Sequence, residues 1–219
     1  LGLYEKGSGI EAVKFFLRCG ARVTVTDLRS AKDLEENVQE LVRYYSKMPK
    51  KHNAPRPPLN LRGGGSARSV EGGVTKLSFI LGKHREEDFV WADLIIQNAG
   101  VPRESPFLTL ARQRKIPIHN DVSIFFTLTP HTYTIGVTGT RGKTTTAILI
   151  AEMLRNTYPR IAALGIATPT GSVSCFSRLD QALADERLRR FSPLVFELSS
   201  WQLELLGEHM VSPRCAVIT

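Results

Sequence analysis

The sequence predicts an α/β protein in which a Rossmann-like N-terminal domain precedes the first part of a second parallel-sheet domain. Two observations predict this class. An apolar helical pattern that ends at Gly20 leads into the β-branched strand 22–26, which is the opening of a βαβ unit. Further on, the apolar strand 133–138 runs into a glycine-rich loop and then into a helix over 145–156. Strands and helices that alternate in this way favour parallel sheets.

The remaining elements follow from the same patterns. Pro130 breaks whatever precedes it, so we place the boundary between a domain 1–129 and a domain 130–219 there. The chain starts and stops within strands, and both ends are expected to be cut from a longer protein. The other expected elements are a helix over 33–45, strands at 77–81 and 93–97, a helix over 106–114, a strand at 116–118, a helical turn or two over 121–128, a helix over 179–190, and strands at 193–196 and 215–219, with 160–178 weakly patterned.

Composition favours a globular protein of a reducing compartment. Apolar residues make up 42% of the chain and charged residues 23%, which is ordinary for such proteins. No apolar run reaches the roughly 18 residues that cross a bilayer, and residues 1–6 lack the order of a signal peptide. The three cysteines form no C-x-x-C pair, which argues against a disulfide framework or a zinc site. We therefore expect a cytoplasmic monomer without a membrane partner.

The net charge of +8 is concentrated in one segment. Residues 41–70 hold seven basic residues and no acidic one, together with several prolines and a triple glycine. Such a segment cannot bury itself, so residues 45–76 are interpreted as a flexible basic insertion. A nucleic-acid-binding arm is the alternative, but such arms usually interleave aromatic residues, and only Tyr44 and Tyr45 lie at its edge.

The loop after strand 133–138 has the composition of a triphosphate site. Glycines let backbone N–H groups point at phosphate oxygens, and the following helix adds its positive end. In such a loop Lys143 would bridge the β- and γ-phosphates of ATP, and the hydroxyl of Thr144 would bind Mg²⁺. The strict G-x-x-x-x-G-K-[ST] pattern is broken by Val137, which stands at the first glycine position. The expected ATP-binding residues are Gly139, Thr140, Arg141, Gly142, Lys143, Thr144 and Thr145.

Glu197 is the candidate for an acidic magnesium ligand. It ends the apolar strand 193–196, and ligands gather at the carboxyl ends of parallel strands. Mg²⁺ usually takes one or two carboxylates or hydroxyls beside phosphate and water. The alternative is a helix-capping or surface role for this carboxylate.

Two motifs resemble the Mur ligases, which build the peptidoglycan stem peptide. The run T-G-T-R-G-K-T-T-T at 138–146 is similar to the ATP loop of that family. The run E-L-S-S-W-Q-L-E at 197–204 is similar to that of its D-glutamate-adding member. The N-A-G-V-P turn at 98–102 stands in the place of the family's S-P-G-[IV]. The resemblance covers nearly the whole chain except about 45–76.

The resemblance implies an ATP- and Mg²⁺-dependent ligase. Its first domain would bind the UDP part of UDP-N-acetylmuramoyl-L-alanine, and its second would phosphorylate the substrate carboxylate. The amine of D-glutamate then attacks the acyl phosphate. Lys143 and Glu197 would be the catalytic residues, with Thr144 and Glu197 on the metal. Residues carried over to the uridine nucleotide are Leu3, Asp27, Leu28, Arg29 and Gly100.

Two departures from the family pattern stand out. The family's first loop is a compact G-L-G-x-[ST]-G, whereas residues 2–9 are longer and charged. The family's G-G-N-I-G segment offers an asparagine near the substrate. Residues 164–168 read L-G-I-A-T, and no role is carried over there.

Other interpretations stay open. Another Mur-type ligase, or an inactive remnant that binds nucleotide only, fits the same motifs. An NAD-binding Rossmann protein is suggested by the G-x-G-x-x-A match at 7–12, with Asp27 as the ribose-binding acid. A GTPase or transport ATPase is a further reading, but no N-K-x-D is present. We expect surface or packing roles for the five histidines, core positions for Phe196 and Trp201, and helix capping by Ser199 or Ser200.

Overall fold

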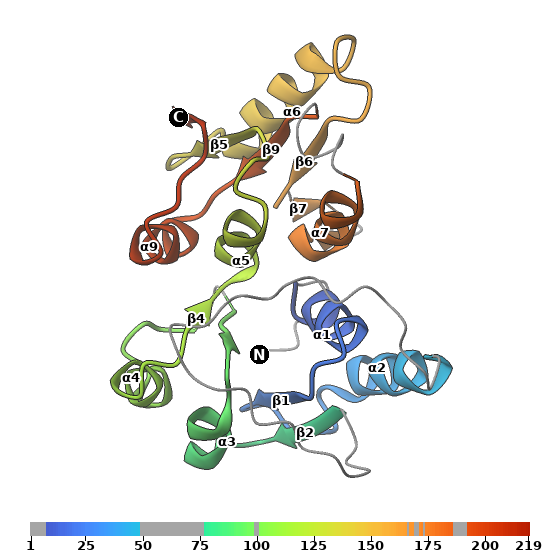
Figure 1. Cartoon of the computed structure of the whole chain (residues 1–219), viewed down its shortest axis with the longest axis vertical. Coiled ribbons are helices and arrows are strands. Elements are labelled where there is room, and N and C mark those ends of the chain that lie inside the picture. The colour runs from blue at the N-terminus through green and yellow to red at the C-terminus, as the bar shows by residue number, and fades with distance from the viewer. Residues whose placement is uncertain are drawn as a thin grey trace. The chain divides into compact units, whose positions relative to one another are not determined.

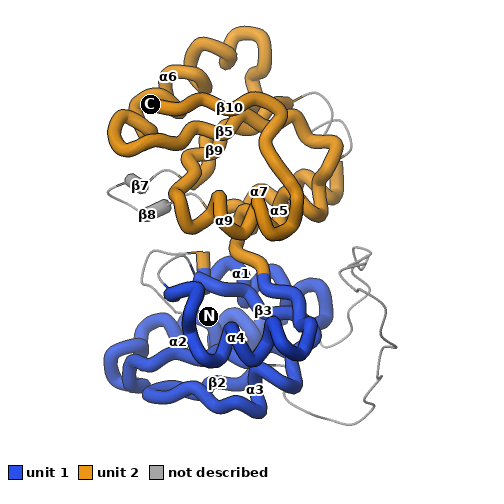
Figure 2. Tube along the Cα trace, turned by 90° about the vertical axis from the view of Figure 1, so that its left-hand side faces the viewer, with its two compact units in different colours: residues 1–5, 9–118 blue, residues 6–8, 119–219 orange. Residues whose placement is uncertain are grey.

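The computed structural model describes residues 8–48, 77–98, 101–165, 167–168, 171–172, 174–185 and 192–219. The chain forms two compact units, one of residues 1–5 and 9–118 and the other of residues 6–8 and 119–219 (Figure 2). Most of the predicted basic insertion lies outside the described residues. Its first residues do not belong to a loop, because helix α2 continues through Lys47.

In the first unit, helix α1 (Ser8–Arg18) is followed by a βαβ unit of β1 (Val23–Asp27), α2 (Glu35–Lys47) and β2 (Leu77–Leu81) (Figure 1). β1 and β2 pair in parallel, from Val23 opposite Leu77 to Asp27 opposite Leu81. The predicted helix stop is confirmed, since Gly20 follows α1 with φ of 80°, a conformation that glycine adopts without strain.

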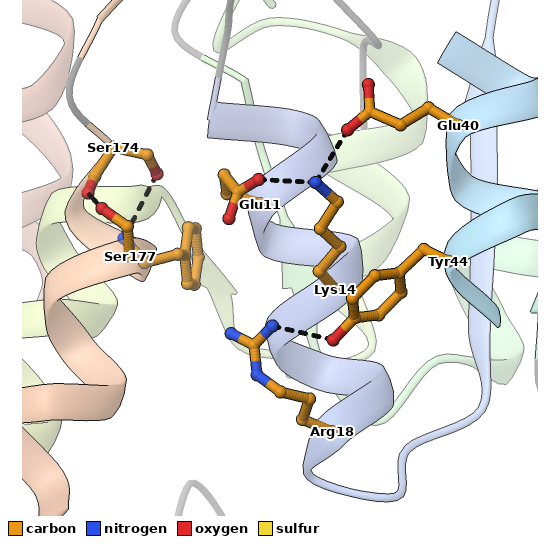
Figure 3. Close-up of polar contacts among 8 residues, drawn as sticks. Glu11, Lys14, Arg18, Glu40, Tyr44, Ser174 and Ser177 are labelled. Atoms are coloured by element: carbon orange, nitrogen blue, oxygen red, sulfur yellow. Dashed lines mark hydrogen bonds and ion pairs between the residues drawn. The ribbon is translucent and has the colours of Figure 1, made fainter. Parts of the chain in front are cut away.

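Polar contacts join α1 to α2 (Figure 3). The Lys14 amine donates to Glu11 at 2.9 Å, one helical turn away, and to Glu40 of α2 at 2.7 Å. Arg18 donates to the hydroxyl of Tyr44 at 3.0 Å. The opposite side of α1 is apolar and buried, so the helix presents one face to the core and holds its neighbour with the other.

The rest of the first unit contains short elements. They are α3 (Glu86–Trp91), β3 (Ile95–Ile96), α4 (Pro106–Gln113) and β4 (Ile118–His119). β3 and β4 form a two-stranded sheet of their own. The sequence patterns did not predict α3, because it is only six residues long and only Phe89 on it is buried. Both predicted strands in this region are shorter than expected.

The second unit is built on a parallel sheet (Figure 1). The strand order is β10-β5-β9-β6, and each neighbouring pair is parallel. A core of Ile135, Val137, Ala147, Ala151 and Val195 lies between this sheet and helix α6. The elements of the unit are α5 (Asp121–Leu128), β5 (Thr134–Thr138), α6 (Lys143–Leu154), β6 (Ala162–Leu164), β7 (Ala167–Thr168), β8 (Gly171–Ser172), α7 (Cys175–Ala184), β9 (Leu194–Glu197), α9 (Ser200–Glu208) and β10 (Cys215–Ile218).

Several boundaries in this unit differ from the predictions. β6 and the β7–β8 hairpin lie in the weakly patterned stretch 160–178. α7 begins at Cys175, capped by Ser174, four residues before the predicted start at 179. Residues 186–190 of that predicted helix lie outside the described residues. α6 begins at Lys143 rather than at residue 145, so Lys143 and Thr144 occupy its first turn.

Helix α5 packs with the second unit. The rings of Phe125 and Phe126 each lie 5.2 Å from the ring of Phe196 on β9, measured between centroids. The compact units therefore divide between residues 118 and 119, eleven positions before the boundary expected from Pro130. Pro130 follows the end of α5. The apolar side chains of α5, however, pack against β9, and this packing assigns the helix to the second unit.

Candidate active site

The loop between β5 and α6 leaves the first amides of a helix without a side-chain cap. Gly139 has φ of 139° and Gly142 has φ of 77°, both in the region that favours glycine. Gly142 is the N-cap of α6 and makes no side-chain capping bond. The first N–H groups of a helix have no acceptor within the helix, and the helix dipole is positive there. This is the arrangement that binds phosphate oxygens.

Lys143 lies over this loop. Its Nζ donates to the carbonyl oxygen of Gly139 at 3.0 Å. The ammonium group is thereby held at the turn that precedes α6. A lysine in this place adds a full positive charge to the partial charge of the helix end.

Glu197 meets Thr144 at the carboxyl edge of the sheet. Glu197 ends β9 and lies opposite Val137 of β5 in the parallel register. The Oγ1 atom of Thr144 donates to Oε2 of Glu197 at 2.7 Å. The two predicted magnesium ligands, 53 positions apart in sequence, are therefore adjacent. A hydroxyl and one carboxylate are oxygen donors of the kind that Mg²⁺ takes beside phosphate and water.

Backbone contacts fix the strand end that carries Glu197. Leu198 donates its N–H to Val137 at 2.9 Å, and the Thr138 hydroxyl donates to the Leu198 carbonyl at 2.9 Å. On the other side, Gly165 has φ of 76°, and a Cβ on it would lie 2.6 Å from the carbonyl oxygen of Glu197. The sequence patterns missed Gly165. A glycine directly after the apolar run 161–164 was the available signal.

Thr219 is a second neighbour of the loop that sequence reasoning missed. Its N–H donates to the carbonyl oxygen of Thr138 at 2.9 Å, and its hydroxyl lies within hydrogen-bonding distance of the carbonyl oxygens of Thr138 and Arg141. A Cβ on Gly139 would overlap the main chain of Thr219. Close approach of this strand end explains why a second glycine stands in the loop.

Helix α9 begins at Ser200, three residues after Glu197, and is capped as predicted. Ser199 is its N-cap in a capping box with Gln202. Gln202 also donates to the carboxylate of Asp121 at 3.3 Å, and burial raises the pKa of Asp121. Phe196 is fully buried, as predicted. The core prediction for Trp201 is wrong, because 51% of that residue is exposed.

The predicted uridine contacts are only partly described. Asp27 is buried, and its carboxylate accepts from the backbone N–H of Arg29 at 2.9 Å and from its guanidinium at 3.1 and 2.9 Å. Leu28 between them is 67% exposed. Leu3 and Gly100 lie outside the described residues. Asp27 and Arg29 thus form a pair, with Leu28 projecting from the same turn.

The G-x-G-x-x-A match does not form the turn that the sequence suggested. α1 begins at Ser8, so both Ser8 and Gly9 are helical, and Gly9 is buried. Gly7 lies outside the described residues. The match therefore places its second glycine inside the helix rather than in the turn that precedes it.

His119 and His209 pack against one another, in agreement with the surface or packing roles expected of the histidines. Their rings stack at 3.7 Å between centroids. His119 is also hydrogen-bonded to Ser123 at 3.1 Å. Within the described residues, no three His, Cys, Asp or Glu side chains gather as a metal site. No helix among those residues has the length and apolarity needed to cross a membrane.

Comparison with known proteins agrees with this geometry. Residues 137–219 match the family model of the Mur ligase middle domain. This stretch begins in β5 and contains the loop, α6 and Glu197. The part of the chain that holds the sheet and the loop is therefore similar to the middle domain of the Mur ligases.

Relatives similar over the whole chain share one name. A UDP-N-acetylmuramoylalanine–D-glutamate ligase of Roseiflexus sp. (strain RS-1) is 34% identical over 219 residues, which is all of this chain and 38% of that protein. The protein of the same name from Borreliella afzelii (strain PKo) is 29% identical over the same coverage, and that of Treponema pallidum (strain Nichols) is 31% identical over 93% of this chain and 31% of its own length. The chain thus spans less than two-fifths of the relatives it matches. The predicted resemblance to the Mur ligase family is confirmed.

Proposed function

We propose that this chain is the nucleotide-binding part of an ATP-dependent ligase that adds D-glutamate to UDP-N-acetylmuramoyl-L-alanine. The observation that carries the proposal is the contact of Thr144 with Glu197 at the end of the glycine-rich loop. The names of the relatives, matched along the entire chain, support the choice of substrates. We further propose that the protein acts as a monomer and is located in the cytoplasm.

The described residues fit a magnesium nucleotide. The amides at the start of α6 and the amine of Lys143 bind the β- and γ-phosphates. Thr144 and Glu197 would supply oxygen ligands for Mg²⁺. When bound, Mg²⁺ offsets the negative charge that develops on the transferred phosphoryl group.

The chemistry runs in two steps. The substrate's terminal carboxylate oxygen attacks the γ-phosphorus of ATP, and the bond to the ADP oxygen breaks, which gives an acyl phosphate and ADP. The amine of D-glutamate then attacks the acyl carbon, and inorganic phosphate leaves as the amide forms. Lys143 stabilises the first transfer because its charge is already in place over the loop.

The uridine nucleotide binds the first unit. Asp27 holds the guanidinium of Arg29 at the carboxyl end of β1, where nucleotides bind in open α/β sheets. Leu28 presents an apolar surface at the exposed position of this turn, which suits the face of a base. Leu3 and Gly100 complete the set of proposed contacts.

The test is phosphate release from ATP by the gene product that contains this chain, with UDP-N-acetylmuramoyl-L-alanine present. D-glutamate, L-lysine and glycine are supplied in turn. We expect release that depends on D-glutamate. Equal rates with all three amino acids would contradict the proposed specificity, and no release with any of them would contradict the ligase itself.

A further inference from the structure

The loops that follow β1 and β2 are joined to one another. Because Asp27 lies opposite Leu81 in the parallel register, the two strands end level. The N–H of Gly82 then donates to the carbonyl oxygen of Arg29 at 2.8 Å. The turn after β2 is therefore hydrogen-bonded to the turn that carries Asp27 and Arg29.

Thr26 and His84 make a second link between these loops. The Thr26 hydroxyl lies 3.2 Å from the carbonyl oxygen of Lys83, to which it donates, and 2.6 Å from Nδ1 of His84. The hydroxyl has one proton but can also accept. When it donates to Lys83, the Nδ1–H of His84 donates to it, so one threonine holds two successive residues of the opposite loop.

An aromatic group holds the imidazole of His84 in place. Its ring meets Phe89 of α3 edge-on at 5.8 Å and Phe107 of α4 at 5.2 Å, between centroids. Phe89 and Phe107 stack on one another at 5.0 Å. Partial burial lowers the pKa of His84, which keeps the ring neutral at pH 7 and leaves one nitrogen as donor and one as acceptor.

A continuous chain of contacts thus reaches the uridine turn. It starts at the phenylalanines, passes through His84 to the hydroxyl of Thr26, and continues along the backbone to Asp27. Asp27 fixes Arg29 through three hydrogen bonds. Thr26 is buried, so the end of β1 cannot shift without breaking its bonds to the second loop.

We propose that His84 is a positioning residue of the uridine-nucleotide site. Through Thr26 it holds the end of β1 so that Asp27 and Arg29 are in place before the nucleoside diphosphate arrives. Preorganisation of this kind strengthens binding because the turn does not have to be ordered by the ligand. This inference rests on the proposed function of the first unit.

The experiment is calorimetric titration of the 219-residue chain with UDP. His84→Phe keeps an aromatic ring beside Phe89 and Phe107 but removes Nδ1, and Thr26→Val keeps the shape of threonine without its hydroxyl. Each is expected to weaken UDP binding about three- to tenfold, the effect of one net hydrogen bond. Because each variant removes the bond between Thr26 and His84, the double variant should bind UDP no more weakly than the poorer single variant. Thr26→Ser, which retains the hydroxyl, should bind like the parent.

The ATP affinity and the thermal midpoint of each variant separate positioning from folding. We expect ATP binding to be unchanged, since its proposed site is in the other unit. Variants that bind UDP like the parent, or a double variant whose loss is the product of the single losses, would overturn the role of His84. A loss of thermal stability with unchanged UDP affinity would do the same. Failure of the parent chain to bind UDP would instead overturn the proposed function.

Discussion

Thr144, in the first turn of α6, donates a hydrogen bond of 2.7 Å to Glu197 at the end of β9. Neither residue defines a site alone, since threonine is common in helix starts and a carboxylate at a strand end can be a surface group. Their contact places a hydroxyl and a carboxylate side by side. The hydroxyl belongs to the residue that directly follows Lys143. The proposed site for magnesium and triphosphate depends on this pair.

Removing the charge of Glu197 should weaken the response to magnesium. Glu197→Gln keeps an oxygen that can accept from Thr144 but carries no charge for the cation. We expect the magnesium concentration needed for half-maximal ATP binding to rise at least about tenfold, because Mg²⁺ prefers anionic oxygen. The measurement is ATP titration at a series of Mg²⁺ concentrations. Glu204→Gln, farther along α9, is the matched control, and an equal response in both variants would argue against the metal role.

Removing the amine of Lys143 should impair catalysis more than folding. One preorganised charge-stabilising group commonly contributes about 10²–10³ in kcat. Lys143→Ala should reduce ATP turnover of the gene product by at least this factor, while the thermal midpoint stays close to that of the parent. Lys115→Ala, outside the loop, serves as the control. Near-normal turnover in Lys143→Ala would remove the lysine from the mechanism.

A methyl group on Gly165 should disturb the position of Glu197. The φ of 76° is strained for alanine, and the added Cβ would approach the carbonyl oxygen of Glu197 to 2.6 Å. We expect Gly165→Ala to lower the free energy of unfolding by about 1–3 kcal/mol, the usual effect of such backbone strain. Urea unfolding measures this.

Gly207 provides the matched control. It lies in α9, and a Cβ there would meet nothing within 4 Å. Gly207→Ala should therefore raise the free energy of unfolding by about 0.5–1 kcal/mol, because alanine favours a helix. A Gly165→Ala variant that is as stable as the parent, or is stabilised like Gly207→Ala, would show that the environment of Gly165 does not restrict it.

His119 should make the second unit sensitive to acid. Burial, and then the neighbouring His209, lowers the pKa of His119 from 6.5 to about 3. The unfolded chain therefore binds a proton on this residue between about pH 6.5 and 3 that the folded chain does not, so stability is present above pH 6.5 and is lost as the pH falls. At pH 5 the loss from this residue is about 2 kcal/mol, at 1.36 kcal/mol per pH unit.

The test compares unfolding at pH 7 and pH 5 in the parent chain and in His119→Phe. The variant loses the bond to Ser123 at both pH values, so the informative quantity is the change in its free energy of unfolding between pH 7 and pH 5. That change should be smaller than in the parent by about 2 kcal/mol. His131→Gln, at an exposed position, should behave like the parent. A pH response in His119→Phe equal to that of the parent would contradict a buried neutral imidazole.

Sequence patterns predicted the parts of the fold that have strong local signals. The strand 133–138, the helix after the loop and the start of α9 are each set by apolar periodicity or by capping residues such as Ser199. Strand β6 was missed because it is only three residues long, and α3 because it buries a single side chain. The secondary structure of such short elements is determined by contacts with residues that are distant in sequence.

Dependence on contacts that are distant in sequence also limits how much of the site could be predicted. Lys143, Thr144 and Glu197 lie in contiguous motifs, so their residue types alone suggested their roles. Gly165 and Thr219 reach the site only because β6, β9, β5 and β10 are neighbours in the sheet, an order that is not visible along the chain. The link from His84 to Thr26 has a similar origin, since 58 positions separate the two.

The most direct test of the central claim is titration of the 219-residue chain with ATP in the presence and absence of Mg²⁺. If Lys143, Thr144 and Glu197 form the nucleotide site, the parent chain binds ATP more tightly with Mg²⁺, and Glu197→Gln loses that gain while retaining weaker binding. Failure of the parent to bind ATP, or a gain from Mg²⁺ that persists unchanged in Glu197→Gln, would contradict the account.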